Sequence, residues 1–129
     1  MSFTLEQINA IHDRLGSAET LAQYAQELHK IGVEHADSYV ADGHSEYFAK
    51  DGHSIVSSPA HEKLAVSEAS DKQGLLYYLD LHDAGKINYL EMSSSLAKSG
   101  IEKWVINTSK LTMTFYDKAG NELLVDDIK

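Results

Sequence analysis

Apolar residues recur every three or four positions over the first thirty residues, a spacing that predicts two amphipathic helices. The first helix spans about residues 4–15 and ends at Gly16, where glycine would serve as a C-terminal cap. The second begins at a capping hydroxyl, Ser17 or Thr20, and ends at Gly32. The apolar stripes are Leu5, Ile8, Ile11 or His12 and Leu15, followed by Leu21, Tyr24, Leu28 and Ile31.

From Val33 the pattern changes to short apolar and aromatic stretches separated by turn residues. Asp42-Gly43 and Asp51-Gly52 are typical of tight hairpin turns, because glycine accepts the positive φ that such turns need. A β-meander is therefore predicted, and the only proline, Pro59, ends it. Its strands are expected around residues 39–40, 46–48 and 54–56, with one more short strand at 64–66.

The same order of signals then returns. A third helix is predicted from Ser70-Asp71 to near Gly85, and a fourth from the cap Asn88 to Gly100. A second meander follows, turned at residues 118–121. Its strands are expected at 104–106, 111–116 and 122–125.

Residues 28–56 and 96–124 match each other at an offset of 68 without a gap. The identical pairs are Leu28/Leu96, Lys30/Lys98, Gly32/Gly100, Glu34/Glu102, Lys50/Lys118 and Gly52/Gly120. We therefore predict an internally duplicated α+β fold, a single domain over 1–129 with pseudo-repeats at about 4–66 and 71–128. A continuous, mostly antiparallel sheet with helices on one face is the expected packing.

Composition narrows the class of protein. A chain of 129 residues with 43% hydrophobic content can bury a core without disulfides or structural metal ions. The lack of cysteine excludes disulfides and thiolate chemistry. No secretory signal and no apolar run of about 20 residues is visible, so we expect a cytoplasmic protein without a membrane partner. The formal net charge of −9, with scattered basic residues, argues against nucleic acid as a partner.

Candidate chemistry is sparse. The two Asp-Gly-His sequences that contain His44 and His53 flank a predicted strand, which would hold the histidines about 25–30 Å apart. They would not share a metal ion, and we predict neither a metal site nor a cofactor. No nucleophile elbow or phosphate-binding loop is present, so catalytic residues stay unknown. Asp42 with His44 is the better site candidate, because turns at the end of a sheet often carry function.

The adjacent aromatic pairs Tyr47-Phe48 and Phe115-Tyr116 lie on equivalent predicted strands. Since side chains alternate along a strand, one ring of each pair would face the helices and the other the opposite face of the sheet. An exposed aromatic patch usually marks a partner or oligomer interface. Tyr47 and Tyr116 are therefore binding candidates.

Several stretches together resemble a known bacterial family. They are VADGHSEYF (40–48), KDGHS (50–54), SSPA (57–60), GIEKWV (100–105) and YDKAGNE (116–122). This pattern resembles the YbcV-like family of unknown function, whose members are often labelled "phage envelope protein". The resemblance implies no activity, cofactor or catalytic residue. Because the chain shows neither a membrane span nor a lipid anchor signal, we interpret the label as a sign of prophage ancestry.

The leading hypothesis is a non-enzymatic interaction or regulatory protein that forms a homodimer, or binds a protein partner, through the less covered face of the sheet. The alternative is a small-molecule binder or enzyme with a cleft between the halves and Asp42, His44 and Glu46 at its rim. A third hypothesis is a phage-derived accessory protein that acts on a host factor through its acidic surface.

Overall fold

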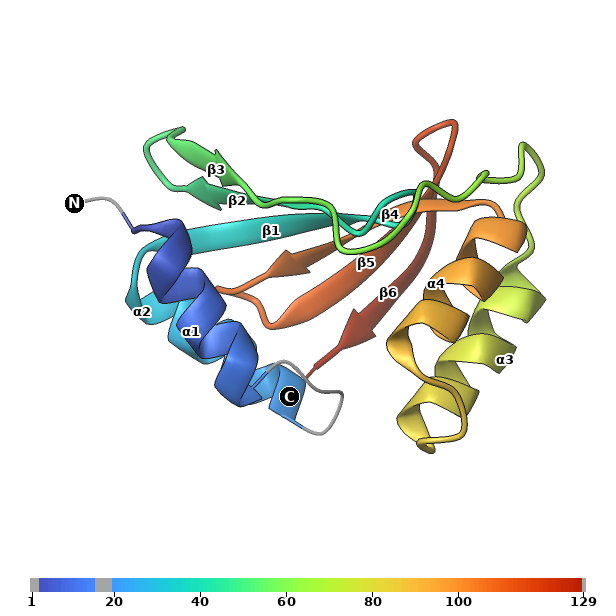
Figure 1. Cartoon of the computed structure of the whole chain (residues 1–129), viewed down its shortest axis with the longest axis horizontal. Helices are drawn as coiled ribbons and strands as arrows, with labels where there is room; N and C mark the ends of the chain where they lie inside the picture. The colour runs from blue at the N-terminus through green and yellow to red at the C-terminus, as the bar shows by residue number, and fades with distance from the viewer. Residues whose placement is uncertain (1–2, 16–19, 129) are drawn as a thin grey trace.

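The computed structural model describes residues 3–15 and 20–128, which form four α-helices and one six-stranded sheet (Figure 1). Two helices followed by three strands occur twice along the chain, as the α+β prediction required. The first half comprises α1 (Leu5–Leu15), α2 (Leu21–Lys30), β1 (Val33–Tyr39), β2 (Ser45–Ala49) and β3 (Ser54–Val56). The second half comprises α3 (Lys72–Asp83), α4 (Tyr89–Lys98), β4 (Ile101–Asn107), β5 (Thr112–Asp117) and β6 (Glu122–Asp127).

The sheet has the order β3-β2-β1-β4-β5-β6, and every neighbouring pair is antiparallel. The first strands of the two halves, β1 and β4, pair at its centre, so the halves share one continuous sheet. Both helix pairs lie on the same side of the sheet, α1 and α2 at one end and α3 and α4 at the other (Figure 1). The predicted packing, with helices on one face of the sheet, is confirmed.

The helix-covered face of the sheet is apolar and buried. Its central strands contribute Ala36, Tyr47, Trp104, Ile106 and Phe115, each at most 8% exposed. The helices contribute Ile8, Ile11, Tyr24, Ala25, Leu28, Leu75, Met92, Leu96 and Ala97 to the same core. Burial of a large apolar side chain stabilises a fold by about 1.5–3 kcal/mol, so this face supplies most of the stability.

The helix starts follow local capping chemistry. Asn88 and Glu91 form a reciprocal capping box at α4, and Asp71 accepts a hydrogen bond from the Gly74 N–H at the start of α3. Both predicted starts are confirmed. Thr20 precedes α2, but its hydroxyl donates to the Leu15 carbonyl at 2.6 Å and caps no N–H of α2. The predicted caps at residues 16 and 17 lie outside the described residues.

The prediction of a further strand at 64–66 is wrong. These residues belong to an irregular connection, residues 57–71, that leads from β3 to α3. The Leu64 N–H donates to the Ala41 carbonyl and the Ser67 N–H to the Ala97 carbonyl, so this segment runs from the β1–β2 turn to α4. Its apolar residues pack against the core without joining a strand ladder.

Equivalent backbone features recur at the offset of 68. The Gly32 N–H donates to the His29 carbonyl and the Gly100 N–H to the Ala97 carbonyl, and each glycine turns its helix into the next strand with positive φ, 101° and 81°. The pairing of β1 with β2 and that of β4 with β5 both shift register just after the strand begins. The two halves therefore build the same junction between helix pair and sheet.

The hairpin turns and the central strand pair obey the same offset, but the β5–β6 pairing then shifts by one residue, so that Phe115 lies opposite Leu124 where the offset would give Leu123. In the β2–β3 and β5–β6 hairpins, the N–H of Ala49 and that of Asp117 each donate to the carbonyl four residues later, His53 and Asn121. At the central pair, the Thr108 N–H donates to the Glu34 carbonyl and the Val40 N–H to the Glu102 carbonyl. The halves are thus related by a pseudo-twofold axis between β1 and β4. Their origin by duplication stays a prediction.

Candidate functional site

The face of the sheet opposite the helices carries polar and aromatic side chains. Strand alternation places His35, Asp37 and Tyr39 of β1 on this face, because Ala36 and Val40 point into the core. Val33 is buried as well, since the strand shifts register between Val33 and His35. The strand registers extend it across the sheet. We call it the open face. Its residues include His35, Asp37, Tyr39, Glu46, Phe48, Val56, Lys103, Val105, Thr114, Tyr116 and Val125.

Asp37 lies at the centre of the open face, opposite Val105 on the pseudo-twofold axis, and is only 7% exposed. The Lys103 ammonium donates to Asp37 Oδ2 at 3.1 Å, and His35 Nδ1 lies 3.2 Å from Oδ1. A carboxylate this buried is costly without partners, and here each oxygen has one. The carboxylate therefore fixes both neighbouring side chains.

Aromatic rings support both partners of Asp37. The imidazole of His35 stacks on Phe48 with ring centroids 4.4 Å apart, and Lys103 Nζ lies 5.6 Å from the ring centroids of both Tyr39 and Tyr116. The offset of 68 maps His35 onto Lys103 and Phe48 onto Tyr116. Each side of the central carboxylate thus carries a nitrogen-bearing side chain held against an aromatic ring.

The environment of Lys103 keeps its side chain charged. Partial burial lowers its pKa, but the hydrogen bond and the charge of Asp37, together with Tyr39 and Tyr116, more than offset this, and the pKa is raised above its ordinary value. A nucleophilic or Schiff-base lysine needs the opposite shift. Lys103 is therefore a positive charge held in place by Asp37 and the two rings.

The turn between β1 and β2 extends this network to the corner of the sheet. Asp42 accepts hydrogen bonds from the backbone N–H of His44, at 3.0 Å, and from its ring nitrogen Nδ1. Although partial burial opposes the effect, these bonds lower the pKa of Asp42. The His44 ring stacks on Tyr39, 4.5 Å between centroids and 10° from parallel. Asp42 thus holds the His44 ring against Tyr39, at the edge of the open face.

The structure brings four of the five candidate residues to this region. Asp42 and His44 form the corner turn, and Glu46 and Tyr116 lie on the open face. The prediction that Tyr47 is an exposed binding residue is wrong, because Tyr47 lies on the helix-covered face and is 6% exposed. The reason is the alternation of β2: Tyr47 pairs with Ala36, a core residue. In the core, burial and the neighbouring Tyr47 raise the pKa of Tyr24.

Sequence reasoning missed His35, Asp37, Tyr39 and Lys103. The first three form an alternating polar series in β1, a period-two signal that marks a strand with one solvated face. Lys103 gave no local signal, since it is one of the scattered lysines and meets Asp37 only through the β1–β4 pairing. The strand register, rather than a motif, assembles this cluster.

No group of three or more histidine or acidic side chains is arranged to hold a metal ion among the described residues. Nor does any helix in this part of the chain have the length and apolar character to cross a membrane. What the open face offers is a fixed pattern of charges and aromatic rings.

Comparison with known proteins gives the chain a family and no activity. No curated protein matches it. A family model fits residues 9–127, which is nearly the whole sequence. The chain belongs to the family described as "Protein of unknown function (DUF1398)".

Proposed function

We propose that the protein is a non-enzymatic interaction module that forms a homodimer through the open face of its sheet. The observation that carries this proposal is the cluster around Asp37, which is held by hydrogen bonds and ring contacts on a face that none of the described helices covers. Tyrosine and long cationic side chains held in place by neighbours are typical of binding hot spots, because little conformational entropy remains to be lost.

Apolar side chains flank this cluster at both edges of the sheet. A row of paired residues crosses the open face from Val56, 54% exposed, to Val125, 52% exposed. The residues between them are Glu46, Asp37, Val105 and Thr114. The two exposed valines at its ends supply apolar area that a partner can cover.

A second copy of the chain is the partner that this symmetry favours. Dimers of identical chains use the same patch on both subunits, so the patch must complement itself. The open face offers Glu46 on β2 and Lys103 on β4, on opposite sides of the axis at Asp37. In a face-to-face packing of two sheets, each acidic side can meet the basic side of the other copy.

The same contacts argue against catalysis at this face. Asp37 is already engaged by two partners, and Lys103 is held in its charged form. The cleft required by the alternative hypothesis would lie between the halves, where five residue pairs of β1 and β4 instead form a continuous strand ladder. For these reasons we propose a binding role and no reaction.

The proposal also covers the cellular location of the protein and its evolutionary origin. We propose that the protein acts in the cytoplasm, since neither an apolar run in its sequence nor a described helix suits a membrane. The resemblance to the YbcV-like family supports prophage ancestry and no envelope role. A host protein contacted through the acidic surface would be a further partner.

The test is the oligomeric state of the wild-type protein and of Val125→Asp, measured by native mass spectrometry and by light scattering over a concentration series. We expect a wild-type dimer, and at least a tenfold weaker association for Val125→Asp, which corresponds to about 1.4 kcal/mol.

The matched control is Leu90→Asp on α4, since Leu90 is 51% exposed, nearly the same as Val125, but lies on the helical side. It should leave the dimer unchanged. A wild-type protein that stays monomeric at high concentration would refute the proposal. So would a dimer that Leu90→Asp disrupts and Val125→Asp does not.

A further inference from the structure

Each half of the molecule has a notch where its helix pair meets the sheet, and among residues 3–15 and 20–128 only the second notch is filled by another segment. A notch is formed by the end of the second helix of that half, the start of its first strand and the hairpin lysine. The first notch contains His29, Gly32 and Lys50, and the second contains Ala97, Gly100 and Lys118, which follow at the offset of 68.

In the second half, the connection before α3 fills the notch. Its backbone donates from Ser67 N–H to the Ala97 carbonyl at 2.9 Å and from Asp71 N–H to the Ser99 carbonyl at 2.8 Å. Between these bonds the segment lies so close to Gly100 that an added Cβ would collide with the Ala69 carbonyl. The second notch thus holds an extended chain segment by its backbone.

One side chain of the filling segment adds a charge contact. Glu68 Oε1 accepts a hydrogen bond from Lys118 Nζ at 2.8 Å, and this carboxylate raises the pKa of Lys118. Upstream in the same segment, Leu64 and Val66 are partly buried against the core. The filler is therefore a short extended stretch with small and apolar residues followed by a glutamate.

The first notch is an open pocket of about 150 Å³. Its lining consists of His29, Gly32, Val33, Glu34, Lys50 and Ser109. At the offset of 68, the first five correspond to Ala97, Gly100, Ile101, Glu102 and Lys118, and Ser109 corresponds to Ala41 in the other half.

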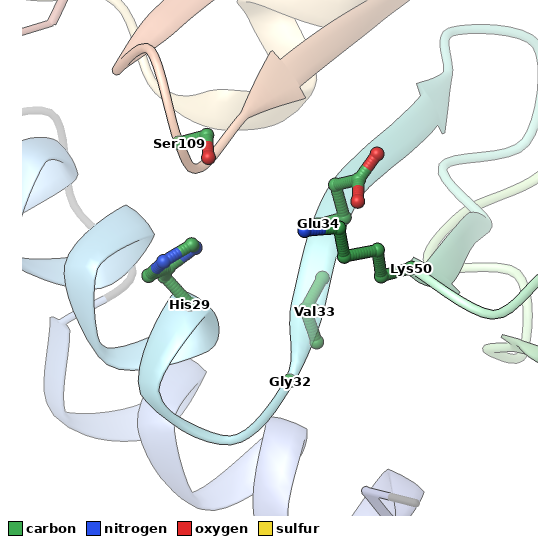
Figure 2. A pocket seen from close by; sticks show the side chains of 6 residues that line it. All are labelled: His29, Gly32, Val33, Glu34, Lys50 and Ser109. Atoms are coloured by element: carbon green, nitrogen blue, oxygen red, sulfur yellow. The ribbon is translucent and has the colours of Figure 1, made fainter.

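The polar groups of this pocket converge from different elements. Figure 2 shows the amino group of Lys50 pointing across β1 toward the space that His29 and Ser109 border. Lys110, next to Ser109 in the β4–β5 turn, stands where the other half has Asp42. Glu34 also lines the pocket, just as Glu102 lies near Lys118 in the second notch. Lys118 nevertheless binds Glu68 there, so Lys50 is the group that an acidic residue of a partner would meet.

His29 adds an acceptor that the second notch lacks. The Thr108 hydroxyl donates its single hydrogen to a backbone carbonyl, that of Val33 at 2.6 Å or that of Glu34 at 2.8 Å. His29 Nδ1, 3.2 Å from the same hydroxyl, must then be the donor in that contact. In the neutral ring this leaves Nε2 as an acceptor for a peptide N–H.

From this correspondence we propose that the first notch binds an extended acidic peptide segment of a partner protein, in the way that the second notch holds residues 64–71. The backbone of the peptide pairs with the exposed end of α2, and a glutamate or aspartate meets Lys50. This site is separate from the open face, so the inference does not rest on the proposed dimer.

The test uses the chain's own filler as the probe. A capped hexapeptide, Leu-Ala-Val-Ser-Glu-Ala, copies residues 64–69 and is titrated to about 40 mM into ¹⁵N-labelled protein, which fills about four fifths of a site with a Kd of about 10 mM. A short free peptide lacks the effective concentration of a tethered one, so we expect a Kd of roughly 1–10 mM. Saturable shifts should appear at the amides of Gly32, Glu34, Lys50 and Ser109.

Changes to the peptide and to the protein distinguish an ion pair with Lys50 from nonspecific binding of the peptide. Replacing the glutamate of the peptide by glutamine should weaken binding about two- to fivefold, the range that an exposed ion pair gives. Lys50→Glu should weaken it further, and Lys86→Glu, on an exposed lysine beyond α3, should not change it. Both variants alter exposed side chains and should fold like the wild type.

The proposal is overturned if the four amides show no saturable shift, or if Lys50→Glu and Lys86→Glu bind the peptide equally. Larger shifts at Gly100 and Glu102 than at the first notch would also overturn it, because the peptide would then be displacing the internal segment. Each of these outcomes is independent of the oligomeric state that tests the open face.

Discussion

The two faces of the sheet are built from adjacent residues of the same strands, but one face is an apolar core and the other carries charged and aromatic side chains. On the covered face, Tyr47 and Phe115 are buried among apolar side chains. On the open face, their neighbours Phe48 and Tyr116 hold a histidine and a lysine against one central carboxylate. The covered face accounts for stability, whereas the open face presents specific chemistry to solvent.

This difference explains why the repeat is clearer on one face. The core positions need only apolar volume, so Tyr47 and Phe115 can replace each other at equivalent sites. Around Asp37, by contrast, the equivalent positions hold different groups, His35 in one half and Lys103 in the other. The two halves are thus more alike in the core than at the centre of the open face.

The largest effect should come from the adjacent pair Phe115 and Tyr116. Phe115→Ala removes a side chain that is 2% exposed and should lower the free energy of unfolding by about 3–5 kcal/mol. Tyr116→Ala, one residue away on the open face, should cost about 1 kcal/mol or less, because its ring is partly solvated. Chemical denaturation of both variants measures the contrast, and equal losses would show that the open face is part of the core.

An intermediate effect is expected for the central ion pair. Asp37→Asn and Lys103→Met each leave a partner without its opposite charge and should cost about 1–3 kcal/mol. The double variant should cost less than the sum, with a coupling free energy of about 1–2 kcal/mol in a double-mutant cycle.

The control for that cycle is the pair Glu68 and Lys118, which has a shorter contact of 2.8 Å but side chains 85% and 41% exposed. Its coupling should be between 0 and about 1 kcal/mol, as is usual for exposed pairs. Equal coupling free energies for the two pairs would show that burial does not strengthen the contact between Asp37 and Lys103. The side chains around Asp37 would then not form a fixed network.

The class of fold was predictable because its signals are local. Helical spacing, the cap at Asn88 and the turn glycines each act over a few residues, and together they define the element order. The extra strand at 64–66 failed because an apolar run says nothing about whether a strand edge is free to pair with it. Leu64 and Val66 are apolar since they pack against the core while filling the second notch.

The candidate site was predictable only in part. Asp42, His44 and Tyr116 follow from turn chemistry and aromatic content, which can be read along the chain. The contact of Asp37 with Lys103 joins residues 66 positions apart and depends on a strand register that no local pattern reveals. Tyr47 was assigned to the wrong surface, because either residue of an adjacent aromatic pair can be the buried one until the register is known.

The smallest effect concerns the corner where the open face ends. The folded-state pKa of Asp42 is lowered, so its contribution to stability is present above the unfolded value of about 3.8 and is lost as the pH falls through the folded value. Asp42→Asn should therefore cost a fraction of a kcal/mol, below about 1 kcal/mol, near neutral pH, and its difference from wild type should shrink below pH 3.8.

The other Asp-Gly-His turn provides the matched control for this measurement. Asp51 also accepts the backbone N–H two residues ahead, at 3.0 Å, but the ring of His53 packs edge-on against Phe3 instead of joining a stack on the open face. Asp51→Asn should thus change the free energy of unfolding less than Asp42→Asn at neutral pH. Identical pH profiles for the two variants would mean that the corner turn is an ordinary hairpin. A larger and pH-dependent loss at Asp42 would instead tie the turn to Tyr39, and through it to the charge network at the centre of the sheet.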